Sequence, residues 1–244
     1  MAEDGESPRK VWRLASSKPK AAHSLGCIVT ISVGKGSEVR EFSVHEELLC
    51  RHSDFFKAAL NGSRWREGLE GKVSLPEEEP EFFEGFQAFL YSGFIFTNDP
   101  AQKEEADDSG CYNDNEYETM GKAWLLADRI QSCSYKDALT DSIALKIVTE
   151  AAYPTGMQNL LREGTSMSAG FPRLLLDVAI CAWDVESFGE LDLDSIPQAF
   201  VMKLIKGLAE SADREDKDRP WVKEDCHYHD HGEEKPCYKI MFTY

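Results

Sequence analysis

The sequence predicts an α+β fold, in which a small β-sheet is covered by a cluster of short helices and is followed by a helical extension. Two observations support this prediction. Between residues 27 and 93, short segments of alternating apolar and polar side chains are each followed by segments with apolar side chains every three or four residues. After residue 120 only the helical spacing recurs. Strands are therefore expected only in the first part of the chain, whereas helices are expected throughout.

The first two strands are expected on either side of a glycine-rich turn. Val29, Ile31 and Val33 alternate with polar residues, and the sequence Gly-Lys-Gly-Ser at 34–37 turns the chain into a second strand at 39–44. The same four residues have the composition of a phosphate-binding loop. They lack the spacing of that motif, and no long helix follows them. A β-hairpin is the better interpretation.

Two short helices are expected next. The first begins at His45 and includes Leu48 and Leu49 on its apolar face. Ser53 then stands where a helix N-cap belongs, because its hydroxyl can accept a hydrogen bond from the first unpaired backbone N–H groups. The second helix ends near Asn61, which is followed by glycine.

A third strand and a longer helix complete the pattern. Val73 and Leu75 alternate with polar residues, and Pro80 occupies a first helical position. The apolar positions of this helix are Phe82, Phe86, Phe89 and Leu90. Gly93 is expected to end it. We predict that Phe56, Phe86 and Leu90 share one core.

The order of these elements resembles a BTB/POZ domain. The similarity rests on Val-His at 44–45, HSDFF at 52–56, LPEEEPEFFEGF at 75–86 and LYSG at 90–93. The sequence is similar to the BTB proteins common in filamentous fungi. The resemblance implies a non-catalytic protein-interaction module that forms homodimers through its first strand and first helices, with Leu48 and Leu49 near the partner-binding surface.

Four parts of the chain are expected. They are a disordered basic leader at 1–23, the BTB/POZ domain at 24–152 with an acidic loop insertion at 98–118, a helical extension at 153–212, and a Cys/His-rich tail at 213–244. The insertion holds eight acidic residues and almost no aliphatic side chain, so it cannot offset the entropy of ordering. Within 153–212, the segment from Leu174 to Trp183 is apolar nearly all round and should be buried.

Composition restricts the possible partners. The net charge of −17 repels nucleic acid, so a nucleic-acid partner is unlikely on charge grounds. The sequence shows no run of apolar residues long enough to cross a membrane and no apolar signal segment, and its seven cysteines do not suggest a disulfide framework. We expect an intracellular protein, in the nucleus or cytoplasm, with no small-molecule substrate.

The tail contains the ligand types that zinc prefers. Cys226, His229, His231 and Cys237 offer two thiols and two imidazoles within twelve residues. The spacing is tighter than that of a usual zinc finger. A possible zinc cofactor and a solvated histidine-rich tail therefore remain as alternative interpretations.

A cullin-type ubiquitin ligase is a possible specific partner. The resemblance implies that an apolar residue followed two positions later by Glu can contact a cullin, and Trp65 and Glu67 occupy the corresponding interval. Trp65 could instead cover the end of the preceding helix. The other function class is a transcription-linked or zinc-binding regulatory protein that uses the BTB domain only to dimerise.

Overall fold

The structure is a computed structural model. It describes residues 26–60, 71–96, 116–150, 153–154, 160–161, 166–167, 170–189, 191, 194, 196–211, 219–222, 226–232 and 235–242. The predicted leader at 1–23, residues 98–115 of the predicted insertion, and both Trp65 and Glu67 lie outside these residues.

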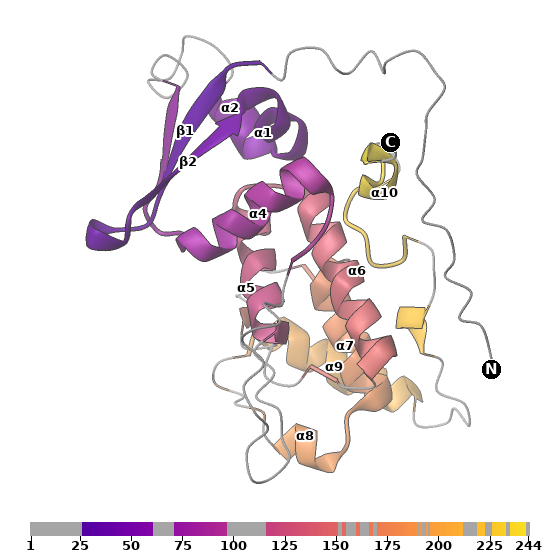
Figure 1. The fold of residues 1–244 in the computed structure, drawn as a ribbon. Coiled ribbons are helices and arrows are strands. Elements are labelled where there is room, and N and C mark those ends of the chain that lie inside the picture. The colour runs from indigo at the N-terminus through magenta and orange to yellow at the C-terminus, as the bar shows by residue number, and fades with distance from the viewer. Residues whose placement is uncertain are drawn as a thin grey trace, which may run out of the picture.

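A three-stranded mixed sheet has the strand order β2-β1-β3 (Figure 1). The strands are β1 (Ile28–Val33), β2 (Arg40–His45) and β3 (Lys72–Leu75), with the 3-10 helix η1 (Gly36–Glu38) in the turn between the first two. β1 pairs antiparallel with β2 and parallel with β3, so that Ile31 lies opposite both Phe42 and Val73. All three of these side chains are buried, because they share the sheet face that the helices cover. The predicted hairpin and third strand are confirmed.

Three helices in the first half of the chain pack around this sheet. They are α1 (Glu46–His52), α2 (Asp54–Leu60) and α4 (Pro80–Ser92). Ser53 caps α2 as predicted, since its Oγ accepts a hydrogen bond from the Phe56 N–H at 3.1 Å. The same hydroxyl donates to the Ile130 carbonyl at 2.5 Å, which ties α2 to the following helices. Gly93 ends α4 with a φ of 75°, a left-handed conformation that favours glycine.

The remaining helices extend from the sheet domain to the other end of the molecule (Figure 1). They are α5 (Glu116–Arg129), α6 (Cys133–Glu150), α7 (Gly170–Ala182), α8 (Val185–Gly189), α9 (Gln198–Ser211), the 3-10 helix η4 (Pro220–Val222) and α10 (Tyr238–Met241). Helix α5 begins at Glu116, so the last three residues of the acidic loop predicted at 98–118 are helical, which corrects that boundary. No helix among the described residues is long and apolar enough to cross a membrane.

One hydrophobic core joins the sheet domain to the C-terminal helices. Phe56 and Phe86 have no exposed surface and Leu90 is 2% exposed, which confirms their predicted place in one core. Phe171 of α7 and Phe200 of α9 belong to the same cluster. The helical extension is therefore packed on the sheet domain rather than tethered to it.

Leu48 and Leu49 are also core residues. Leu49 is fully buried and Leu48 is 7% exposed, because α1 turns its apolar face toward the interior. Neither side chain is available at the surface in this conformation. Their burial indicates that they stabilise the domain, and their expected place near a partner-binding surface stays a prediction.

Candidate metal centre

The C-terminal segment brings two cysteines and two histidines together beside α6. One ligand atom from each of Cys226, His229, His231 and Cys237 lies within 4.8 Å of the others. A turn places the first two, since the His229 N–H donates to the Cys226 carbonyl at 3.1 Å. Cys237 immediately precedes α10. These are the four residues that the sequence singled out.

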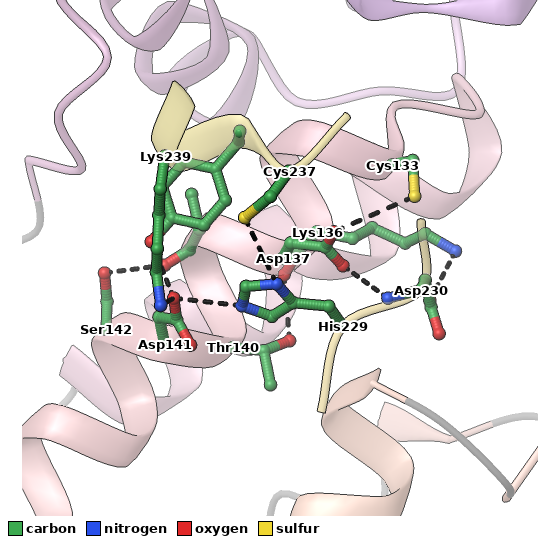
Figure 2. Close-up of polar contacts among 12 residues, drawn as sticks. Cys133, Lys136, Asp137, Thr140, Asp141, Ser142, His229, Asp230, Cys237 and Lys239 are labelled. Atoms are coloured by element: carbon green, nitrogen blue, oxygen red, sulfur yellow. Dashed lines mark hydrogen bonds and ion pairs between the residues drawn. The ribbon is translucent and has the colours of Figure 1, made fainter. Parts of the chain in front are cut away.

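The distances between the ligand atoms suit tetrahedral coordination of a zinc ion. With Zn–N near 2.0–2.1 Å and Zn–S near 2.3 Å, neighbouring ligand atoms in a tetrahedron lie about 3.3–3.8 Å apart. Nδ1 of His229 lies 3.6 Å from Sγ of Cys237, which falls inside that interval. Small side-chain shifts would bring the remaining ligand atoms within it. Figure 2 shows the Cys237 thiol beside the His229 ring, which lies next to the side chains of Asp137 and Asp141 of α6.

Asp141 orients the His229 ring. Nε2 of His229 lies 3.0 Å from Oδ2 of Asp141, as an ion-pair contact rather than a well-aligned hydrogen bond, and the imidazole is 1% exposed. A carboxylate can only accept, so the proton belongs on Nε2. Nδ1 then presents its lone pair toward Cys237. This carboxylate–histidine arrangement is the usual support for a histidine that binds zinc.

His231 has a free lone pair in the same place. Its Nδ1 lies 2.5 Å from the Gly232 carbonyl, which can only accept, so Nδ1 carries the proton. Nε2 is buried and has no hydrogen-bond partner among the described residues. Buried polar atoms are nearly always paired, and a bound metal would satisfy this one.

The two thiols complete the donor set. Desolvation, and then the neighbouring Cys237 thiol, raises the pKa of Cys226 above its ordinary value. Loss of hydration and the neighbouring sulfur disfavour a thiolate on Cys226, and the charge of Lys239 offsets them only in part. A divalent cation reverses this balance and stabilises both thiolates. Thiolates together with imidazoles favour zinc over magnesium or calcium, which prefer oxygen ligands.

Helix α6 supplies a polar support beneath the cluster (Figure 2). Asp141 also accepts a hydrogen bond from the Tyr238 hydroxyl at 2.7 Å and pairs with Lys239 at 2.9 Å. Burial alone would raise the pKa of Asp141, but the contacts from His229, Lys239 and Tyr238 outweigh it and hold that pKa below its ordinary value. Asp141 is therefore a carboxylate shared by a candidate ligand and by α10.

A second set of contacts fixes residues 226–232, which lie against both α6 and α7. Asp137 accepts a hydrogen bond from the Asp230 N–H at 2.6 Å, and Lys136 pairs with the Asp230 carboxylate at 2.9 Å. On α7, Arg173 contacts Nε2 of His227 at 2.8 Å, and the Tyr228 hydroxyl donates to Asp177 at 2.9 Å. Together these contacts hold residues 226–232 against the body of the protein. Residues 226–232 are therefore an integral part of the fold.

Sequence reasoning missed these supporting residues. Asp141 lies 88 positions before His229, and an isolated Asp on an amphipathic helix carries no local signal of its partner. Asp137 and Lys136 are equally ordinary surface-type residues in the sequence. The only available signal was their shared helix, since Asp137 and Asp141 are four residues apart and therefore lie on one face.

Comparison with known proteins assigns the first part of the chain. Residues 21–110 match the family model described as BTB/POZ domain. The search of curated proteins returned no significant match. The metal cluster lies outside the matched residues, so the family match says nothing about it.

Proposed function

This chain carries a BTB/POZ domain at residues 21–110, and from that premise we propose that it is a non-catalytic module that binds proteins and pairs with a second copy of itself. BTB/POZ domains are protein-interaction domains. When a protein binds copies of itself, the commonest assembly is a symmetric dimer.

Exposed apolar side chains on the BTB/POZ domain support this proposal. Ile28 on β1 is 63% exposed and lies opposite His45, whose ring contacts the Tyr91 hydroxyl of α4 at 2.8 Å. Just beyond α4, Phe94 is 68% exposed and Phe96 is 65% exposed. Apolar side chains gathered at a surface are typical of a site that a partner covers.

Light scattering coupled to size exclusion tests the pairing. The wild-type chain is expected to show the mass of a dimer at tens of micromolar, and Phe94→Ser should shift it toward monomer. Met202→Ser is the matched control, because Met202 on α9 is 60% exposed but lies outside this surface. A monomeric wild-type protein would contradict the proposed pairing.

We further propose that the Cys/His cluster binds one zinc ion with a structural role. The observation that supports it is the approach of four suitable ligand atoms to within 4.8 Å, with both histidines oriented by hydrogen-bonding or charged partners. Four protein ligands leave no open position for a substrate, which is the usual difference between a structural and a catalytic zinc. Zinc thiolates need reduced cysteines, so we place the protein in the nucleus or cytoplasm.

A more specific form of the proposal is an adaptor for a cullin-type ubiquitin ligase. It depends on the sequence alone, through Trp65 and Glu67 in the interval between α2 and β3. An aromatic anchor beside an acidic residue is a common composition of a binding hot spot. Calorimetry should show that Trp65→Ala weakens cullin binding by about 2 kcal/mol or more. No association of wild-type chain and cullin at tens of micromolar would refute the adaptor role.

The alternative is a transcription-linked or zinc-dependent regulatory protein that uses the BTB/POZ domain only to dimerise. The proposed zinc site is equally compatible with this regulatory role and with the adaptor role. Dimers that bind zinc but no cullin would support this alternative.

A further inference from the structure

The last eight described residues connect the metal cluster to the BTB/POZ domain. We call residues 235–242 the strap. It begins at Lys235, whose Nζ pairs with Asp54 of α2 at 2.8 Å, and it contains the ligand Cys237. Figure 1 shows the strap, in yellow, running beside α6 toward α4. The strap ends at Phe242 on the BTB/POZ domain.

Phe242 covers a buried surface of that domain. Its ring stacks on His52 of α1, with a centroid separation of 5.2 Å and an interplanar angle of 19°, and it meets Phe89 of α4 edge-on at 5.1 Å. A Cβ on Gly93 would lie 2.5 Å from the Phe242 ring, so the absence of a side chain at Gly93 makes this close contact possible. His52 is 5% exposed and Phe89 is fully buried.

Beyond the aromatic packing of Phe242 and Tyr238 on Phe89, most of the described polar contacts of the strap lie around the metal cluster. Helix α10 has four residues, which is too short to be stable without tertiary support. The pair between Lys235 and Asp54 is about half exposed at both ends and contributes little. Tyr238 and Lys239 are held by Asp141, the carboxylate that also orients His229. The attachment of the strap and the metal site therefore use the same residues.

We propose that the strap is a metal-dependent cover of the BTB/POZ domain: zinc holds it down, and loss of zinc releases it and exposes His52, Phe89 and Gly93. This inference depends on the zinc site proposed above. The uncovered surface would be continuous along the chain with Phe94, which is already exposed. The state of the metal would then set how much aromatic surface the domain exposes.

Hydrogen–deuterium exchange of the full chain tests the release. The metal content is first measured by elemental analysis, and the zinc-loaded chain is then compared with the same chain after chelation. We expect amides in residues 86–96 and 235–242 to exchange about tenfold faster or more once zinc is removed, because local opening controls their exchange. The β1–β2 hairpin at 28–45 serves as the internal reference and should not change.

The variant Phe242→Ala tests the covering role of the strap separately from zinc binding. Phe242→Ala keeps all four ligands, so the chain should retain one zinc while residues 86–96 exchange faster with the metal still bound. One bound zinc with unchanged exchange at 86–96 after chelation would refute the cover and leave the zinc site standing. Absence of stoichiometric zinc in the wild-type chain would refute both proposals.

Discussion

Replacing Asp141 by Asn tests whether α6 supports a metal site. The carboxylate lies 3.0 Å from Nε2 of His229, 2.7 Å from the Tyr238 hydroxyl and 2.9 Å from Nζ of Lys239. An amide keeps the shape but loses the charge, and it retains only one accepting oxygen. The Lys239 side chain is 46% exposed, so its pair with Asp141 adds little. The main loss is the contact that fixes the tautomer of His229.

The expected effect follows from that contact. Loss of a group that supports a metal ligand weakens metal affinity by about 10–100-fold. We therefore expect Asp141→Asn to weaken zinc binding by about 30-fold, or about 2 kcal/mol. Competition with a chromophoric zinc chelator at pH 7 measures the change in apparent Kd.

Asp184→Asn is the matched control. Asp184 accepts hydrogen bonds from Ser187 at the start of α8, where Asn serves equally well, and it is not one of the residues around the cluster. Its variant should bind zinc as tightly as the wild-type chain. If Asp141→Asn also leaves the zinc affinity unchanged, the argument that Asp141 orients a ligand is refuted.

Two further predictions concern the BTB/POZ core. Phe86→Ala should lower the free energy of unfolding by about 3–5 kcal/mol because the ring is fully buried, whereas Phe94→Ala should change it little, as urea denaturation would show; equal effects would contradict the assigned core. Burial, and then the nearby Arg51 charge, lowers the pKa of His52 to about 4, so the unfolded chain binds a proton at a higher pH than the folded chain does. Stability should therefore fall as pH drops from 6.5 toward 4, by about 2 kcal/mol between pH 7 and pH 5, and His52→Gln should remove this part of the pH dependence; an unchanged profile in the variant would refute it.

The sequence predicted the sheet and the helices around it because each element carries its own local signal. Ser53 and Gly93 are examples: a side-chain cap and a left-handed residue are local requirements, and both occur as expected. Leu48 and Leu49 show the limit of such signals. An apolar helix position suits either the interior of one chain or an interface between two, and only the packing of α1 distinguishes these cases.

The metal cluster was predictable in its ligands but not in its surroundings. The four donor residues are of the types that zinc prefers, so the sequence alone singled them out as possible ligands. The contacts between His229 and Asp141, and between Phe242 and Gly93, join positions far apart in the sequence, so no local spacing encodes them. For the same reason the sequence indicated a tail, whereas the structure places residues 226–232 and 235–242 against the protein.

The most direct test of this account is the zinc content of the intact chain by native mass spectrometry. The protein would be prepared under reducing conditions, supplied with zinc and desalted. The account predicts one zinc per chain in the wild type and none in the double variant Cys226→Ser, Cys237→Ser. A wild-type mass equal to that of the bare polypeptide, or an equal zinc load on both proteins, would contradict a zinc site built by these residues.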